Sequence, residues 1–258
     1  MAESQIQNFN HLKIHSQFSI CEGAIKIDDL KEISKEKKIR SLALCDTSNL
    51  CGALEFAEKI SKVGTQPIIG TQINFKLDDT IGLLPLFALN EIGYKRIIEL
   101  SSLSYLNNDG TLDPHLNFEE LLKNNEGVAI FSGTINGLVG QLFNKGKFSE
   151  IEKLYSKLKQ KYGDKFYIEI QRHGDQNEIS FEKFNLSQSL NLEISIIATN
   201  EVFYSNKDMY EAHDALICIK NKTYVNEKNR IKYSNQHYLK DNSEMSELFS
   251  DLPEALEN

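Results

Sequence analysis

Proline, tryptophan and cysteine are scarce in this sequence. Its 258 residues hold 4 prolines, no tryptophan and 4 cysteines. The cysteines form no CxxC pair and no spacing typical of a disulfide framework, which indicates a reducing compartment, the cytoplasm. The 14 glycines are spread along the chain, and no stretch is dominated by glycine, serine or proline. The composition therefore predicts continuous fold, without a flexible linker or a disordered tail.

Long apolar runs and an excess of positive charge are also missing. Residues 1–17 show no basic region followed by an apolar run, and no window approaches the roughly 18 apolar residues of a membrane span. The sequence thus predicts a protein that is neither secreted nor inserted in a membrane. The 29 lysines and arginines face 37 aspartates and glutamates, giving a net charge of -8. That balance disfavours DNA binding by this chain alone, because a phosphate backbone repels it.

Short apolar segments alternate with helical patterns along the chain. Strands are expected at 11–16, 40–46, 67–75, 83–89, 127–133, 166–172 and 193–202. Helices are expected at 27–38, 50–64, 92–104, 136–146 and 180–190, with a last one starting at Ser243 as N-cap. Strands that alternate with helices favour parallel pairing and an α/β class. Periodicity alone leaves a closed barrel and an open, doubly wound sheet as alternatives.

Polar residues follow several of these strands, where parallel β/α proteins gather their reactive groups. In the first strand, alternation points His11, Lys13 and His15 to one face. Among the other strand ends and the first loop, only Glu22, Asp46 and Glu201 add good metal donors. Too few donors are therefore present for an ordinary cluster of divalent ions.

The chain resembles the PHP domain of the bacterial DNA polymerase III alpha subunit. The resemblance rests on KIDDL, NLCGALEF, PIIGTQ, NEIGYKRIIELSS, FYIEIQRHG, ATNEVFY and EAHDALICIKNK, which occur in this order and at similar spacing. It covers nearly the whole chain and implies a distorted seven-stranded β/α barrel, with residues 1–258 as one PHP domain. About 25 to 30 residues at the end would begin the connection to the polymerase core. Active PHP domains hold divalent metals at the strand ends and hydrolyse phosphoesters.

The resemblance also implies a metal site that this chain has lost. The positions that correspond to the family's metal ligands are Lys13, His15, Glu22, Asp46, Thr47, Gln72, Leu83, Thr134, Glu201 and Phe203. Most of these side chains no longer have a donor suited to metal. No catalytic residue and no bound metal are therefore expected in this domain, and His15, Asp46 and Glu201 are only weak metal candidates.

Lys13 leads to a specific hypothesis about this lost site. It stands where the family has an imidazole, and its ammonium group would repel a metal ion. We expect it to neutralise an acidic pocket of Glu22, Asp46 and Glu201, because unpaired buried carboxylates are costly. His15 is expected to be hydrogen-bonded to Asp46 or Glu201 rather than to a metal. Arg172 with His173, and His213 with Asp214, are interpreted as packing or inter-domain contacts.

The resemblance implies a role within a larger enzyme. The whole protein would be a DNA-directed DNA polymerase whose Mg²⁺ ions and catalytic carboxylates lie in a core outside this chain. The domain itself would have a structural role and dock the proofreading exonuclease subunit, and it would meet DNA only through the full-length holoenzyme. The alternatives are a metal-dependent phosphoesterase or 3′-5′ proofreading exonuclease, and, less favoured, a free-standing small-molecule phosphatase of the same superfamily.

Overall fold

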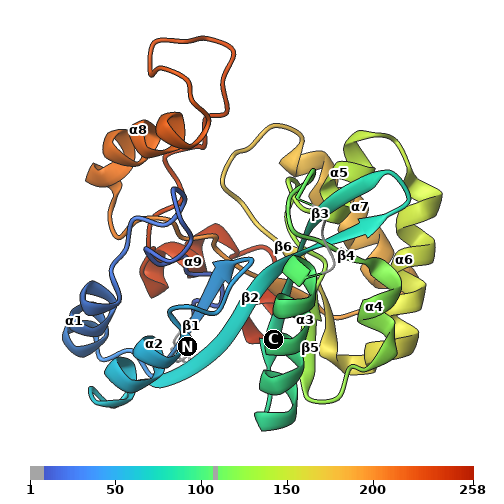
Figure 1. Cartoon of the computed structure of the whole chain (residues 1–258), viewed down its shortest axis with the longest axis horizontal. Helices are drawn as coiled ribbons and strands as arrows, with labels where there is room; N and C mark the ends of the chain where they lie inside the picture. Colours follow the sequence, from blue (N-terminus) through green and yellow to red (C-terminus); the bar gives the residue numbers. More distant parts are fainter. Residues whose placement is uncertain (1–8, 107–109) are drawn as a thin grey trace.

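A seven-stranded sheet forms the centre of the molecule, with helices around it (Figure 1). The computed structural model describes residues 9–106 and 110–258. The strands are β1 (Ser41–Thr47), β2 (Gln66–Leu77), β3 (Thr80–Ala88), β4 (Leu116–Asn117), β5 (Val128–Phe131), β6 (Phe166–Ile170) and β7 (Ile196–Ala198). The helices are α1 (Ile27–Lys37), α2 (Ala53–Ser61), α3 (Glu91–Leu106), α4 (Phe118–Lys123), α5 (Leu138–Asn144), α6 (Phe148–Tyr162), α7 (Glu178–Leu192), α8 (Tyr210–Lys220), α9 (Asn242–Leu248) and α10 (Glu254–Glu257). The α/β class is thus confirmed.

The sheet runs in the order β1-β2-β3-β5-β6-β7, with β4 paired to β2. Neighbouring strands are parallel except at β3, which is antiparallel to both β2 and β5. The expectation of parallel pairing is therefore wrong at β3. A tight connection at Asp78, with a positive φ of 51°, turns the chain directly from β2 into β3 and leaves no room for a crossover helix.

The segment expected as the first strand, 11–16, closes the sheet into a distorted barrel. Ile14 forms parallel bridges both to Leu44 in β1 and to Val202 just after β7. The backbone N–H of Cys45 donates to the Ile14 carbonyl, and the N–H of His15 donates to the Val202 carbonyl. The segment makes only isolated bridges rather than a regular strand, but these bridges join the two ends of the sheet.

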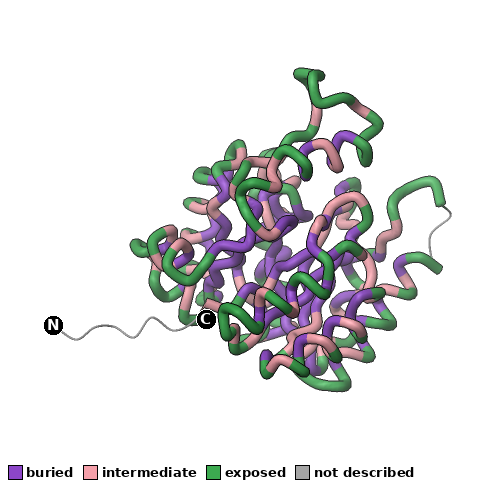
Figure 2. The backbone as a smooth tube through the Cα atoms, turned by 90° about the vertical axis from the view of Figure 1, so that its left-hand side faces the viewer, coloured by how far each residue is buried: buried purple, intermediate pink, exposed green. Residues whose placement is uncertain are grey.

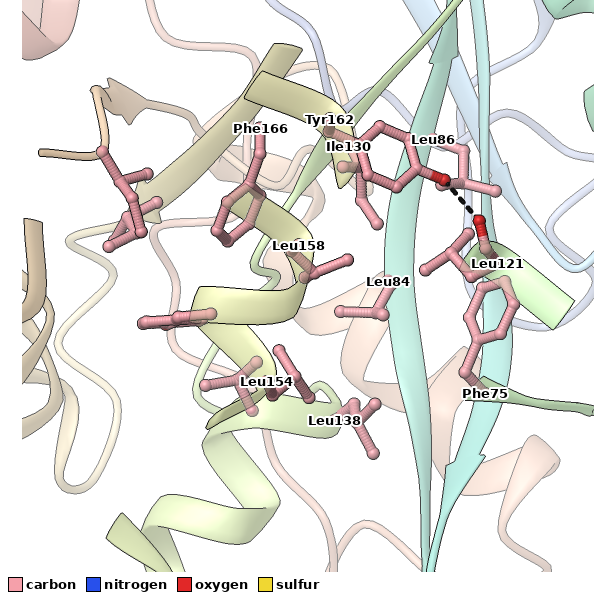
Figure 3. Packing of buried hydrophobic residues seen from close by; sticks show 14 of the residues in the cluster. Phe75, Leu84, Leu86, Leu121, Ile130, Leu138, Leu154, Leu158, Tyr162 and Phe166 are labelled. Carbon is pink, nitrogen blue, oxygen red and sulfur yellow. Dashed lines mark hydrogen bonds between the residues drawn. The ribbon is translucent and has the colours of Figure 1, made fainter. Parts of the chain in front are cut away.

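The main core lies between the sheet and the helices that cover it. Phe75 and Leu84 from the β2–β3 pair pack in one cluster with Leu154 and Leu158 of α6 (Figure 3). The Tyr162 hydroxyl in this cluster donates to the Leu121 carbonyl at 3.0 Å, which satisfies its polar end inside the core. Figure 2 shows the buried backbone running through the centre of the molecule, with exposed residues on the outer turns. The same strands position the polar groups on the inner face of the barrel.

The helix predicted to start at Ser243 begins two residues earlier in the structure. Asp241, rather than Ser243, is the N-cap of α9, and it forms a capping box with Glu244. The Asp241 carboxylate accepts the Glu244 N–H at 2.9 Å, and Glu244 accepts the Asp241 N–H at 2.9 Å. Aspartate and serine are about equally good N-caps, but only Asp241 has a glutamate three residues later to complete a capping box, since Ser246 stands three residues after Ser243. In the described part of the chain, no helix has the length and apolar character needed to cross a membrane.

Candidate functional site at the strand ends

Lys13 lies at the centre of a buried charged cluster inside the barrel. Its side chain is fully buried, and its Nζ lies 3.3 Å from Glu169 Oε1 and 3.2 Å from Glu201 Oε1. Neither contact has the angle of a hydrogen bond, so the attraction is that of an ion pair. One ammonium is thus shared between two carboxylates.

The charges of this cluster stabilise one another. Burial alone would lower the pKa of Lys13, but the charges of Glu169 and Glu201 outweigh burial and hold the pKa above its ordinary value. Burial alone would raise the pKa of Glu201, but Lys13, followed by His15, holds it well below its ordinary value. At neutral pH, Lys13 is therefore cationic and Glu201 is anionic. A buried pair of this kind is costly to break, because the remaining charge has no partner.

His15 and Gln72 also contact the Glu201 carboxylate. His15 Nε2 lies 3.2 Å from Glu201 Oε1, and Gln72 Nε2 donates to the same oxygen at 2.8 Å. On the other side of the imidazole, Nδ1 lies 3.2 Å from Ser19 Oγ and 3.4 Å from Thr47 Oγ1. Lys13 and His15 reach Glu201 from the same face of the segment, as alternation predicted, and His15 binds a carboxylate. The third member of that row, His11, instead lies 2.8 Å from the Lys240 carbonyl.

Asp46 lies outside the Lys13 cluster. Its carboxylate accepts the Ser16 N–H at 2.7 Å, the Ser16 hydroxyl at 2.8 Å and the Ser19 hydroxyl at 2.7 Å. These donors hold both oxygens of Asp46 toward the loop that follows residue 15. The expectation that Asp46 is a partner of Lys13 is therefore wrong.

Glu22 is also directed away from the cluster. Its carboxylate pairs with Lys220, and its backbone carbonyl lies 2.8 Å from His213 Nε2. Glu22 thus joins the first loop to α8, which stands with its following loop at the edge of the molecule (Figure 1). The expectation that Glu22 contributes to the pocket of Lys13 is wrong, because a nearer lysine from α8 neutralises it.

The other predicted positions make contacts that need no metal. The Phe203 ring packs on the His15 imidazole with 4.7 Å between centroids. Thr134 Oγ1 accepts the Asn136 N–H at 3.1 Å within its own turn, and the residue lines a small cavity with Glu169. Leu83 is half-buried on β3 and pairs in register with Asn74 on β2. None of these three side chains offers a ligand atom suited to a divalent ion.

Glu169 is the functional residue that sequence reasoning missed. Its neighbours Ile168 and Ile170 pack in the main core between sheet and helices, so alternation along β6 turns Glu169 toward the inside of the barrel. Its Oε1 accepts from Gln171 Nε2 at 2.9 Å and from the Thr199 hydroxyl. A lone glutamate in the apolar strand FYIEI was the available signal, because a buried charge needs a partner.

The residues at the strand ends do not fit a cluster of metal ions. The Lys13 ammonium lies between the two carboxylates that could bridge ions, and Asp46 is already fully hydrogen-bonded. Elsewhere in residues 9–106 and 110–258, His173, Asp175 and His237 place donor atoms within 4.8 Å of one another. Those three were not predicted as metal ligands.

Comparison with known proteins agrees with this barrel. Residues 11–173 match the PHP domain family. The chain belongs to the PHP domain family. Among curated relatives, DNA polymerase III subunit alpha of Caulobacter vibrioides is 34% identical over 100% of this chain. The subunits of Rickettsia felis and Borreliella burgdorferi are 37% and 35% identical over 97% of it. This PHP chain spans only 21% to 23% of the length of these relatives.

Solved structures give more distant likenesses to this PHP domain. An amidohydrolase from Chromobacterium violaceum matches at 12% identity and a TM-score of 0.49, covering 80% of this chain and 96% of the other. A two-domain protein from Bacteroides vulgatus, described as containing a predicted PHP-like metal-dependent phosphoesterase, matches at 12% identity and a TM-score of 0.41. That match covers 92% of this chain and 62% of the other.

Proposed function

We propose that this chain is the PHP module of a replicative DNA polymerase of the DNA polymerase III alpha type, and that the module is structural rather than hydrolytic. The observation that carries the proposal is the buried Lys13 ammonium between Glu169 and Glu201. By the resemblance, position 13 would hold a metal-binding imidazole in the family, and a fixed positive charge there would compete with a metal ion for the same carboxylates.

The polymerase assignment is supported by the relatives, which are DNA polymerase III alpha subunits matched along the chain. In this proposal, nucleotide transfer and its Mg²⁺ ions belong to the core of the longer polymerase, and the whole protein works in the cytoplasm. The net charge of -8 opposes direct contact of this module with DNA. DNA is therefore reached through the full-length holoenzyme.

The structural role includes docking of the proofreading exonuclease subunit. A module that lacks its own hydrolytic centre can still keep proofreading close to the polymerase by binding a separate exonuclease. The test is size-exclusion chromatography of the purified chain mixed with the exonuclease subunit from the same organism. A shared peak is expected for the mixture. Separate elution of the two proteins at micromolar concentrations would remove the docking role while leaving the absence of hydrolysis untouched.

The competing function is a metal-dependent phosphoesterase or a 3′-5′ exonuclease. It is tested by incubating the chain with an aryl phosphodiester and with a 3′-labelled oligonucleotide, in the presence of Mn²⁺, Zn²⁺ or Mg²⁺. We expect no turnover above that of the matched variant His15→Asn, which removes the imidazole at the centre of the strand-end site. Turnover by the wild-type chain that disappears in His15→Asn would overturn the proposal.

A further inference from the structure

A second group of chemistry-bearing side chains lies beside the Lys13 cluster and takes no part in it. His173 and Asp175 come from the loop between β6 and α7, and His237 comes from the segment before α9. The two imidazoles stack with 4.0 Å between centroids and 4° between planes. His237 Nε2 lies 3.9 Å from Asp175 Oδ2. Three donor side chains from two distant segments therefore form one cluster.

A backbone carbonyl orients the His237 ring, as is common for a metal-binding imidazole. Its Nδ1 lies 3.0 Å from the Glu201 carbonyl, which can only accept, so Nδ1 carries the proton. The other nitrogen, Nε2, then presents a lone pair, yet it is buried without a hydrogen-bond partner. In metal sites, a ligating histidine commonly donates its second N–H to a backbone carbonyl. A buried nitrogen without a hydrogen-bond partner is unusual in proteins, and a bound metal ion would account for it.

His173 also has a nitrogen without a hydrogen-bond partner. Its Nε2 lies 3.1 Å from Asn200 Oδ1, which can only accept, and 3.2 Å from the Glu201 nitrogen, so Nε2 carries the proton. Its Nδ1 then keeps a lone pair, and it is buried and makes no hydrogen bond. That Nδ1 lies 3.5 Å from Glu178 Oε1, beyond a good hydrogen bond. Glu178 is held by the N–H groups of His173, Gly174 and Asp175, which fixes the shape of the loop. The loop thus presents His173 and Asp175 together.

We propose that His173, Asp175 and His237 bind one divalent transition-metal ion of the zinc or cobalt type. Two imidazoles and one carboxylate suit such an ion, and water would complete the coordination. The Asp175 side chain is 18% exposed while those of both histidines are nearly fully buried, so the ion would enter from the side of Asp175. None of these residues lies at the positions that correspond to the family's metal ligands.

Ion binding requires a small rearrangement of the stacked rings. The lone pairs lie in the ring planes, and an ion cannot lie in two parallel planes at once. One imidazole must therefore turn about its Cβ–Cγ bond, and the donor atoms must approach from up to 4.8 Å to about 3.3 Å, the separation that bonds of roughly 2.0 Å impose. The bound ion would fasten the loop after β6 to the segment before α9.

The proposal is tested by titrating the purified chain with Co²⁺, followed by visible absorption, and with Zn²⁺, followed by calorimetry. One equivalent of each ion is expected to bind. The variants His237→Asn, which keeps a donor for the Glu201 carbonyl, and Asp175→Asn should each weaken binding at least tenfold. The matched controls His15→Asn, at the strand-end site, and Asp164→Asn, an exposed carboxylate, should bind as the wild type does.

Three outcomes would overturn this metal site. They are the absence of saturable binding to the wild-type chain, unchanged binding by both His237→Asn and Asp175→Asn, and loss of binding in His15→Asn. Circular dichroism checks that each variant is folded, and if His237→Asn is not, Asp175→Asn decides. The result is independent of the hydrolysis assay, since one ion bound by these three residues would not provide the metal cluster that active PHP domains hold at their strand ends.

Discussion

The Lys13 ammonium lies 3.2 Å from the Glu201 carboxylate, and both side chains belong to the interior of the barrel. Lys13 comes from the segment that closes the barrel, and Glu201 follows β7 directly. The ion pair therefore joins the first and last parts of the sheet at the point of closure. The charge of Lys13 is therefore expected to contribute to the free energy of unfolding.

Replacement of Lys13 by methionine is expected to destabilise the chain by about 3 to 5 kcal/mol, because Glu169 and Glu201 would remain buried without their cation. Urea unfolding followed by circular dichroism measures the change. The control is Lys95→Met, which breaks the exposed pair with Glu91 and should cost less than about 1 kcal/mol. Equal losses in the two variants would show that the buried charge is not needed.

Arg172 is expected to hold the C-terminal helices against the barrel. Its guanidinium pairs with Glu182 on α7 and with Asp251, and it donates to the Leu248 carbonyl at 2.7 Å. Arg172→Ala should cost about 1.5 to 3 kcal/mol, the range for hydrogen bonds to charged groups. It should also speed amide exchange in α9 and α10. The control Lys159→Ala removes the more exposed pair with Asp164 and should leave that exchange unchanged.

His11 is expected to make the stability depend on pH between 6.5 and 4. Burial lowers the pKa of His11 from 6.5 to about 4. The unfolded chain therefore binds this proton first as the pH falls, and stability is lost from pH 6.5 down to 4, by about 3 kcal/mol from this group. Free energies of unfolding measured across this range should fall less steeply for His11→Gln. An identical slope in the variant would contradict the assignment.

Glu201 should act in a lower pH window. Because its folded pKa lies well below its ordinary value, the stability it contributes is complete above about pH 4.5 and is lost as the pH falls further. Glu201→Gln should therefore flatten the stability profile only below about pH 4.5 and leave the slope between 6.5 and 4.5 as in the wild type. If the variant's stability profile were instead flatter only between pH 6.5 and 4.5, the loss of stability below about pH 4.5 would belong to another group.

Local patterns in the sequence predicted most of the elements but not how they are joined. The apolar runs at 67–75 and 83–89 both correspond to strands, yet their antiparallel pairing follows from the short turn at Asp78. Two acidic residues in succession gave no signal strong enough to distinguish this turn from a loop leading to a helix. The alternating residues at 11–16 predict a regular strand, whereas the segment makes isolated bridges to both ends of the sheet.

The candidate site was predictable where a single strand determines it and not where distant segments meet. Alternation alone brings Lys13 and His15 to one face, and both do reach Glu201. Lys13 pairs with Glu169 rather than with Asp46 or Glu22. The sequence does not predict this, because Asp46 bonds to nearby serines and Glu22 pairs with a lysine from α8. The stacking of His173 on His237 likewise depends on tertiary folding, because the two rings come from segments far apart in the sequence.

We expect the charge of Lys13 to hold the buried carboxylates of Glu169 and Glu201 together in place of a metal ion. A double-mutant cycle with Lys13→Met, Glu201→Gln and the combined variant tests it most directly, by urea unfolding at pH 7. We predict a coupling free energy of at least about 2 kcal/mol, with the combined variant more stable than Lys13→Met alone. A coupling below about 0.5 kcal/mol would contradict the account, because the two charges would then act independently.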